Sequence, residues 1–577
     1  MNVFRHLSTR RAREAASYEI DPEDVFLDSE NLSSLDISQM QGQLERPLGK
    51  HIFYIALFAT ILLIGGFSYR LFAMQVINVD VYQEKSDNNH LKKIPLFALR
   101  GTISDRKGQL LAWNTQSGAV GTSTLEAKAI DDIPKRVYTE TKGFAHLLGY
   151  VSYPKKDQSG IFWQDEYIGK TGVEKQYQTE LGGVRGERII EVTALREIEA
   201  QNVVIYPSHG ENVTLSVDKD VQAKLQESMA SLARKVGFTG GAGVIMDVTN
   251  GEILAITSFP EYDNNLITNA TTKAEKSAVG EELLDKRRKF LDRAVSGLFT
   301  PGSTVKPFFA YGALVENIIT PEKNIFSSGQ LVIKNKYDGP DTVFKDWKAH
   351  GYVDMRDAIA ESSDEYFYQI GGGYQDQKGL GIARLEQYAN LFGFATTTGI
   401  DLPAEEYGLV PSPAWKKKVF GEDWLLGNTY HSSIGQYGFQ VTPLELVRAV
   451  AAIANGGTLV TPHVLLRMEA KTKELNLNQK NLQVIQEGMR DAVISSKGTA
   501  KGLNIQGVTV SAKSGTAELG VSKQQVNSWI SGYFPAEKPK YAFVVIMEKG
   551  DRNNPYGAVV AIKETLEWMR DNTSYTK

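Results

Sequence analysis

The chain has one long uninterrupted apolar stretch near its start. Residues 51–69 read HIFYIALFATILLIGGFSY and carry no formal charge when His51 is neutral. At 1.5 Å per residue, a helix of this length spans about 28 Å, close to the thickness of a bilayer's hydrocarbon core. No Ala-x-Ala cleavage site follows, which disfavours a cleaved signal peptide. Because the apolar character continues to Ile77, we expect an uncleaved transmembrane anchor over residues 51–77.

The segment before the anchor, residues 1–50, is polar and rich in acidic residues, a composition typical of a disordered tail. Within about 20 residues of the span, Lys and Arg are equally frequent on both sides. The whole short tail adds Arg5, Arg10, Arg11 and Arg13 on the N-terminal side. This excess favours a cytoplasmic N-terminus.

Short alternating runs and turn signals fill residues 78–211, which we interpret as a β-rich pedestal domain. The segment 100–108 reads RGTISDRKG and is followed by Gln-Leu-Leu-Ala, a pattern that predicts a hairpin turning at Asp-Arg-Lys-Gly. Residues 140–205 contain further short elements. The Gly-Lys-Thr at 169–171 lacks the earlier glycine of a phosphate loop, since Gln164 stands there.

A second domain is expected from Asn212 to the end of the chain, residues 212–577. Residues 213–217 alternate as a strand, and Asp218 is placed to cap a helix running to Leu232. Two further strands, 243–248 and 252–256, are joined by Asn-Gly, a strong hairpin signal.

The rest of this domain is expected to be helical in the middle and β-rich at the end. A polar, charge-rich loop is predicted over about 264–292, and helical periodicity then dominates to about 495. The chain closes with predicted strands at 507–518, 527–534 and 541–548, followed by a helix at about 557–571. Strands at both ends of a domain indicate an α/β (α+β) fold with an antiparallel sheet flanked by helices.

Composition narrows the class of protein. At 577 residues the chain is too long for one ordinary core, and 42% hydrophobic with 23% charged residues is typical of a folded protein. A net charge of −4 argues against nucleic-acid binding. The chain has no cysteine, and its eight histidines show no metal-binding spacing, so we expect no metal site.

The candidate chemistry begins at Ser303-Thr304-Val305-Lys306, between a Thr-Pro-Gly turn and an apolar run. Ser-x-x-Lys at the start of a helix places the hydroxyl and the amine on one face, and a neutral lysine there can accept the hydroxyl proton. The motif is weak alone, since Ser104, Ser152, Ser216 and Ser574 also begin one.

Two downstream elements distinguish Ser303 from the other four serines. Ser362-Ser363-Asp364 and Lys513-Ser514-Gly515-Thr516 follow it in the order of the serine/lysine acyl-transferase set. In such a site Ser303 attacks a carbonyl, Lys306 is the base, and Lys513 supplies positive charge. In the alternative, purely structural interpretation, Ser303 and Ser362 are helix caps and Lys513 is a solvated strand residue. The presence of all three motifs disfavours this interpretation.

Roles for the remaining site residues follow from the same chemistry. Ser362, predicted on a helix from Glu361 to Gly371, relays a proton towards the leaving amine. The strand with Ser514, Gly515 and Thr516 pairs with the substrate, and the amides of Ser303 and Thr516 form the oxyanion hole. A charged Asp364 beside Lys306 would oppose its neutral form, so we expect Asp364 either to direct its charge at Lys513 or to accept hydrogen bonds from substrate and Lys306.

These motifs resemble those of the class B penicillin-binding proteins. Further matches are the segment 100–108, Gly169–Glu174, Phe344-x-Asp346-Trp347-Lys348, Gly399–Leu402 and Ile434–Gln436, so that the resemblance runs from about 48 to 570. Aspartate at position 364, where most relatives have asparagine, is similar to the elongation-type penicillin-binding protein 2.

The resemblance implies a transpeptidase that cross-links peptidoglycan stem peptides ending in D-Ala-D-Ala and that β-lactams acylate on the same serine. It implies no cofactor. It implies attachment to the bacterial inner membrane, with the catalytic domain outside, and partnership with a membrane glycosyltransferase of the shape, elongation and division type and other elongation-complex proteins.

Two features depart from the family pattern. Only about 30 residues separate Asn114 from His146, where relatives carry a longer head, and nothing before residue 212 resembles a glycosyltransferase. The second feature favours a monofunctional enzyme. Two alternatives stay open: a D,D-carboxypeptidase or β-lactamase that passes the acyl group to water, and a non-catalytic β-lactam-binding scaffold.

Overall fold

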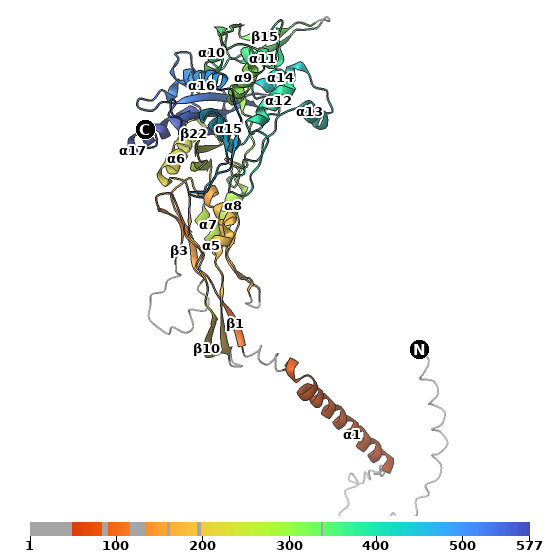
Figure 1. Ribbon diagram of the computed structural model, residues 1–577. Coiled ribbons are helices and arrows are strands. Elements are labelled where there is room, and N and C mark those ends of the chain that lie inside the picture. The colour runs from red at the N-terminus through yellow and green to blue at the C-terminus, as the bar shows by residue number, and fades with distance from the viewer. Residues whose placement is uncertain (1–48, 83–90, 116–132, 159–161, 193–197, 336–338) are drawn as a thin grey trace, which may run out of the picture. The chain divides into compact units, whose positions relative to one another are not determined.

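The computed structural model describes residues 49–82, 91–115, 133–158, 162–192, 198–335 and 339–577, with side chains except at 91–94 and 190–204. The chain divides into two compact units, Met1–Asn89 and His90–Lys577 (Figure 1). The predicted disordered tail and most of the short head lie outside the described residues.

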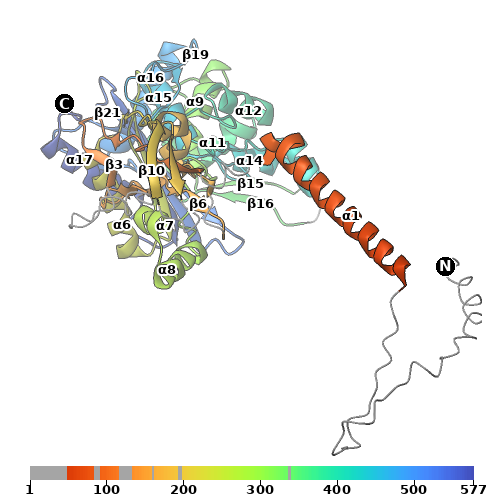
Figure 2. The ribbon, with the colours of Figure 1, turned by 90° about the horizontal axis from the view of Figure 1, so that it is seen from below.

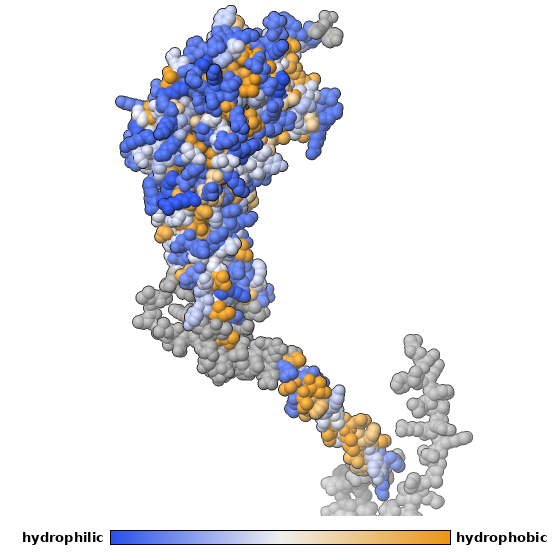
Figure 3. All heavy atoms as spheres, in the orientation of Figure 1, coloured by the Kyte–Doolittle hydropathy of each residue, from blue (hydrophilic) through white to orange (hydrophobic). Residues whose placement is uncertain are grey.

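The first unit contains the predicted apolar helix. Helix α1 spans Lys50–Phe72 and continues as a π-helical turn over Ala73–Ile77, and none of these residues is buried. Lys50–Ile77 is the one helix of the described residues that is long and apolar enough to cross a membrane. Figure 3 shows apolar side chains along the visible face of this helix. The finding agrees with a single-pass anchor.

The second unit begins with the β-rich pedestal. The predicted hairpin forms from β2 (Ile103–Ser104) and β3 (Leu110–Thr115), which pair antiparallel. They belong to a four-stranded sheet of order β11-β2-β3-β4, with β4 at Lys135–Tyr138 and β11 at Val213–Thr214. The predicted strand at 213–217 is thus shorter than expected.

The other pedestal elements are short. A three-stranded ribbon has the order β1-β9-β10. Its strands are β1 (Leu91–Leu96), β9 (Gly186–Val192) and β10 (Ile198–Ile205). The remaining strands are β5 (Val151–Ser152), which pairs with β8 (Ile168–Gly169), and β6 (Lys155–Lys156), which pairs with β7 (Phe162–Gln164). The helices are α3 (Ala145–Leu148), α4 (Gly172–Gln176) and α5 (Gln178–Gly182).

A buried ion triad holds the pedestal together. Glu174, from α4, lies between Arg100 and Arg136, and all three side chains have no exposed surface. Arg136 Nε donates to Glu174 Oε1 at 2.7 Å, and Arg100 Nη2 donates to the Glu174 carbonyl oxygen at 2.7 Å. Burial raises the pKa of Glu174, but the charges of Arg136 and Arg100 outweigh burial and hold it below its usual value. The motifs at 100–108 and 169–174 therefore meet in one contact.

The catalytic domain is built on a five-stranded antiparallel sheet of order β13-β12-β22-β21-β20. Its strands are β12 (Gly240–Asp247), β13 (Ile253–Phe259), β20 (Ser511–Leu519), β21 (Gln525–Phe534) and β22 (Tyr541–Asp551). The Asn-Gly hairpin and all three C-terminal strands are confirmed. The sheet joins segments that lie nearly 300 residues apart in sequence, as the strand pattern predicted.

Alternate residues of the central strands face two separate cores. Val244 and Val544 belong to one hydrophobic cluster, and Ile245 and Val545 belong to the other. Helices α6 (Lys219–Val236) and α17 (Ala558–Asn572) lie side by side in Figures 1 and 2 and pack on the second cluster. Helix α15 (Pro443–Ala454) packs on the opposite face. Asp218 caps α6, as predicted.

The remaining elements join the sheet to the active-site region. Figure 1 shows α9, α11, α12 and α14 gathered near β15. The helices are η4 (Gly302–Val305), α9 (Lys306–Val315), α10 (Met355–Ala360), α11 (Asp364–Gly372), α12 (Gly381–Leu391), α13 (Pro413–Phe420), α14 (Leu426–Ser433), α16 (Gln479–Ile494) and η5 (Lys501–Leu503).

Two expectations for this part were wrong. The predicted loop at 264–292 contains α7 (Asn264–Asn269) and α8 (Lys273–Leu284), because Thr272 and Glu275 form a capping box that starts α8. The predicted helical region also contains three strand pairs. They are β14 (Ile325–Ser327) with β17 (Gly351–Val353), β15 (Gln330–Ile333) with β16 (Thr342–Lys345), and β18 (Thr458–Val460) with β19 (Thr472–Glu474).

We predict that Glu174→Gln lowers the free energy of unfolding by about 3–5 kcal/mol, because it leaves two buried guanidinium groups without their carboxylate. Glu180→Gln, at an exposed residue of α5, serves as the control and is expected to change stability by no more than about 0.5 kcal/mol. Urea unfolding measures both variants. Equal effects would contradict the structural role of the triad.

Candidate active site

Ser303 lies on a tight turn that leads into a buried helix. The 3-10 turn Gly302–Val305 runs directly into α9, and the Gly302 amide donates to the Gly435 carbonyl oxygen at 3.0 Å. Gly302 has φ +55°, and a Cβ there would lie 2.7 Å from the carbonyl oxygen of Thr516. Only glycine allows the third motif's strand to approach the turn this closely.

The Ser303 hydroxyl is half-buried, and within the described part of the chain it makes no hydrogen bond. Lys306, one turn further on, has a side chain with no exposed surface. Its Nζ donates to the carbonyl oxygen of Ser362 at 2.8 Å and to Asp364 Oδ1 at 2.6 Å, and Ser362 Oγ lies at 3.4 Å. The first two motifs therefore meet at the lysine amine.

Ser362 does not lie on a helix, which corrects the prediction of a helix from Glu361. It stands in the turn between α10 and α11 with φ +59°, a left-handed conformation. Ser363 is the N-cap of α11, and its Oγ accepts from the Tyr366 amide at 3.3 Å. The prediction failed because α11 begins one residue after this cap, at Asp364.

Lys513, from the third motif, also contacts the Ser362 hydroxyl. Its fully buried Nζ donates to Ser362 Oγ at 2.8 Å and to the Ser514 carbonyl oxygen at 2.9 Å. Burial and the nearby charge of Lys306 lower the pKa of Lys513 well below its ordinary value, although Asp364 opposes them. Two lysines thus share one hydroxyl, and the surroundings of Lys513 favour its neutral form.

The contacts of Asp364 agree with both predicted roles. Its Oδ1 accepts from Lys306 at 2.6 Å, whereas Lys513 makes its hydrogen bonds to Ser362 and Ser514. Asp364 is therefore a hydrogen-bond acceptor for Lys306. Its charge also acts on Lys513 without a direct contact, because it raises the pKa of that lysine.

The third motif lies on the edge strand β20. Gly515 passes the nucleophile turn so closely that a Cβ there would lie 2.8 Å from Thr304 Cγ2. Thr516 is exposed. The Ser514 hydroxyl donates to Thr499 Oγ1 at 2.8 Å, in the segment that follows α16. An edge strand offers unpaired backbone groups to an extended peptide.

Sequence reasoning gave no role to a buried polar cluster behind Ser362. Asp346, His350 and Glu361 have buried side chains and contact one another around this turn. Asp346 was noticed only as part of a family match. Among the described residues, no group of three or more His, Asp or Glu side chains has the arrangement needed to hold a metal ion.

The competing serines have other partners. Ser104 Oγ lies 3.3 Å from Thr214 Oγ1, and the buried Ser216 hydroxyl donates to the Ile253 carbonyl oxygen.

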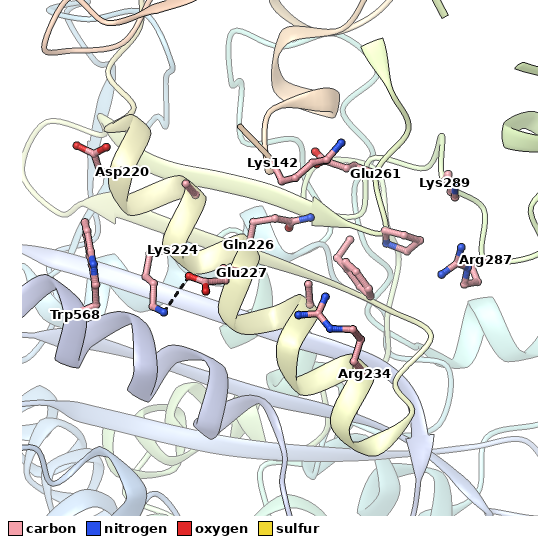
Figure 4. Close-up of a pocket in the computed structure, with 14 residues that line it drawn as sticks. Lys142, Asp220, Lys224, Gln226, Glu227, Arg234, Glu261, Arg287, Lys289 and Trp568 are labelled. Atoms are coloured by element: carbon pink, nitrogen blue, oxygen red, sulfur yellow. Dashed lines mark hydrogen bonds and ion pairs between the residues drawn. The ribbon is translucent and has the colours of Figure 1, made fainter. Parts of the chain in front are cut away.

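A cavity of about 700 Å³ lies over α6, between Lys142, Arg234 and Trp568 (Figure 4). No residue of the three motifs lines it.

Family comparison identifies both parts of the second unit. Residues 241–564 match the family described as penicillin binding protein transpeptidase domain, and residues 122–215 match the penicillin-binding protein dimerisation domain. The first match covers more than half of the chain and includes all three motifs.

Individual relatives agree with this assignment. Peptidoglycan D,D-transpeptidase MrdA of Haemophilus influenzae is 28% identical over 90% of this chain and 91% of its own. Penicillin-binding protein 2 of Helicobacter pylori, solved in complex with MreC, has 28% identity and a TM-score of 0.68, covering 84% of this chain and 99% of that one. A chain of a peptidoglycan synthase complex, whose structure concerns the coordination of polymerization and crosslinking, has 27% identity and a TM-score of 0.70, covering 91% and 99%.

The expected fold is therefore confirmed by family, by architecture and by solved relatives. The same findings confirm the expected enzyme class and disfavour the scaffold and hydrolase alternatives. The chain belongs to the penicillin-binding protein transpeptidases, and its activity is that of a peptidoglycan D,D-transpeptidase.

Proposed function

We propose that Ser303 carries the acyl group in peptidoglycan cross-linking by this chain. Ser303 Oγ forms an ester with the carbonyl carbon of the penultimate D-Ala, and the amide bond to the terminal D-Ala breaks. The terminal D-Ala leaves with a proton on its amine. An acceptor amine then attacks the ester, which forms the cross-link and regenerates the Ser303 hydroxyl. β-lactams stop at the ester stage.

The observation that carries this proposal is the convergence of three distant motifs on one hydroxyl. Lys306 Nζ lies 3.4 Å from Ser362 Oγ, and Lys513 Nζ lies 2.8 Å from it. Lys306 itself stands one helical turn after Ser303. A proton can therefore pass from Lys306 through Ser362 to Lys513. Lys306 then becomes the neutral base that accepts the proton of Ser303.

The electrostatics support this order of events. Burial and the charge of Lys306 lower the pKa of Lys513, which favours its neutral amine before substrate arrives, while Lys306 is paired with Asp364. Transfer of one proton along the Ser362 hydroxyl exchanges the two states without moving charge out of the buried site. The Lys513 ammonium that results adds positive charge beside the third motif, and this charge is expected to favour the negative charge that develops on the substrate.

Substrate binding is assigned to the edge strand β20. We expect the stem peptide to add to the strand beside Gly515 and Thr516, with the amides of Ser303 and Thr516 as the oxyanion hole. The close approach of Gly302 and Gly515 supports this assignment, because it brings the turn and the strand together.

The setting in the cell follows from the substrate and the anchor. Peptidoglycan lies outside the cytoplasmic membrane, so a catalytic domain beyond α1 requires the N-terminus to be cytoplasmic. We assign residues 1–50 to the tail, 51–77 to the anchor, 78–211 to the pedestal with its short head, and 212–577 to the transpeptidase domain. A relative solved with MreC and another in a synthase complex support partnership with elongation proteins and a membrane glycosyltransferase.

The first test follows D-Ala release from a stem peptide with and without an acceptor amine. Wild type is expected to form cross-linked product and to gain a penicillin adduct in intact mass. Ser303→Ala is expected to do neither, and Lys306→Ala to slow acylation by about 10²–10⁴, the usual contribution of a positioned base. Ser104→Ala is the matched control and is expected to behave as wild type. A penicillin adduct on Ser104, or release of D-Ala only to water, would overturn the proposal.

The second test concerns the pH dependence of acylation. Asp364 raises the pKa of Lys513, so removing its charge in Asp364→Asn should lower that pKa further. Because the site needs a neutral amine, the rising limb of the acylation profile is expected to move to lower pH, with substantial activity retained.

Asp364→Ala also removes the acceptor for Lys306 and is expected to lose about 10²-fold. Acylation rates from about pH 6 to 10 distinguish the three proteins. An Asp364→Asn protein as inactive as Ser303→Ala would show that the carboxylate charge itself is required.

The third test concerns the partner. We infer a monofunctional enzyme, so the purified chain alone is expected to make no glycan from lipid-linked disaccharide. Cross-linked product should appear when a membrane glycosyltransferase of the elongation type is added. Glycan formed by the purified chain would contradict a monofunctional enzyme.

A further inference from the structure

The turn that presents Ser362 requires support from its surroundings. Its φ of +59° belongs to a conformation that residues with a Cβ rarely adopt, and such conformations persist only where neighbouring contacts fix them. The turn sets two contacts at once, because Lys306 binds both the Ser362 carbonyl oxygen and Asp364. Groups that hold the residues before and after Ser362 therefore control the geometry of both lysines.

The residue before the turn is held by buried charge. Glu361 has a side chain that is 2% exposed, and its carboxylate contacts Lys348 Nζ at 3.0 Å and Lys497 Nζ at 3.3 Å. Its Oε2 also accepts from His350 Nδ1 at 2.9 Å. Three positively charged or proton-donating groups from two segments thus contact Glu361: Lys348 and His350 from one, and Lys497 from the other.

The residues after the turn are held by a second carboxylate. Asp346 has no exposed side-chain surface, and its Oδ2 accepts from the Ser363 hydroxyl at 2.9 Å and from the Glu365 amide at 2.8 Å. These two donors flank Asp364. One carboxylate therefore fixes the chain on both sides of the residue that binds Lys306.

His350 joins the two carboxylates. Its ring has no exposed surface, and its Nδ1 makes a hydrogen bond to Glu361 Oε2. Its Nε2 makes no hydrogen bond to any described residue but lies within ion-pair distance of Asp346 Oδ1, at 3.4 Å. Its backbone amide donates to the Ser327 carbonyl oxygen at 3.2 Å, which fixes the segment that carries it. The Trp347 ring packs edge-on against the imidazole at 5.4 Å between centroids. The imidazole therefore bridges residue 361 to residues 363–365 behind the turn.

We propose that His350 is a positioning residue for the transpeptidase reaction. By contacting both Glu361 and Asp346, it holds Ser362 and Asp364 where both can accept hydrogen bonds from Lys306. It touches neither the substrate nor the reacting atoms. The inference deepens the proposed function and rests on the roles assigned there to Ser362 and Asp364.

Charge around the imidazole gives the proposal a second readout. Asp346 and Glu361 contact the ring; Lys348 contacts the same Glu361 oxygen as His350, and Lys497 contacts the other one. Burial raises the pKa of Asp346, but His350, Lys306 and the Glu365 amide outweigh it and lower that pKa to about 2. Without the imidazole the pKa of Asp346 rises. Asp346 then takes up a proton at a higher pH and loses part of its capacity to accept from Ser363 and Glu365.

The experiment measures β-lactam acylation of the full chain in detergent, across a range of pH, for His350→Ala and His350→Asn. His463→Gln is the matched control. His463 is equally buried and its two ring nitrogens contact the carbonyl oxygens of Leu465 and Asn250, remote from the three motifs. Thermal unfolding of each variant establishes that the protein is folded at the assay temperature.

We expect His350→Ala to acylate about 10²-fold more slowly, the usual effect of a small displacement of catalytic groups. The acid limb of its profile should move to higher pH. His350→Asn retains a donor towards Glu361 and should recover part of the rate. His463→Gln should lose stability but keep the wild-type rate and profile.

Two results would overturn the inference. One is wild-type acylation by His350→Ala with an unmoved acid limb; the other is an equal loss of rate in His463→Gln at an equal loss of stability. Ser362→Ala separates the inference from the function on which it rests. Wild-type acylation by Ser362→Ala would overturn both, whereas a slow Ser362→Ala beside a normal His350→Ala would overturn only the role of His350.

Discussion

Two lysine side chains without exposed surface, Lys306 and Lys513, lie against the same serine hydroxyl, and one carboxylate, Asp364, stands beside them. Burying two ammonium groups beside one carboxylate is unfavourable, because each charge loses its hydration and the two repel one another. The site relieves this cost by lowering the pKa of Lys513. The lowered pKa of Lys513 is therefore a consequence of how the core is packed, because burial is its largest cause.

The arrangement of the sheet provides that packing. Strand β20 brings Lys513 to the edge of the sheet, and the glycines at 302 and 515 let the nucleophile turn lie against it. Helix α11 begins immediately after the Ser362 turn, so the second motif is fixed by the start of a helix on one side and by Glu361 on the other. The three motifs come from segments far apart in sequence, and the third of them lies on a strand of the sheet. Catalytic geometry and the long-range topology are thus one property of this domain.

Local sequence signals predicted the elements with strong local causes. The Asn-Gly hairpin, the Asp218 cap and the strands after residue 507 were recognisable because turn chemistry and alternation act over a few residues. Helix α8 departs from the prediction although its capping box is local, because its charged composition is also typical of a loop.

The motif residues Ser303, Lys306 and Lys513 were also predicted from sequence, since their order and spacing are distinctive. The features of the site that the sequence did not predict depend on contacts between segments that are distant in sequence. The left-handed turn at Ser362 and the partner of Asp364 depend on side chains from other segments. The contacts of His350 with Glu361 and Asp346 likewise could not be predicted, because these three residues share no periodicity or spacing in the sequence.

The two buried ion clusters of the second unit show why residue type matters at such sites. In the pedestal, Arg100 and Arg136 surround Glu174; in the active site, Lys306 and Lys513 lie beside Asp364. Both place two basic side chains near one carboxylate. Guanidinium stays protonated at every physiological pH and binds carboxylate in a fixed planar geometry, so the first cluster can only hold the pedestal together. A buried amine can lose its proton, so the same charge pattern built from lysines becomes a site that can accept and return one.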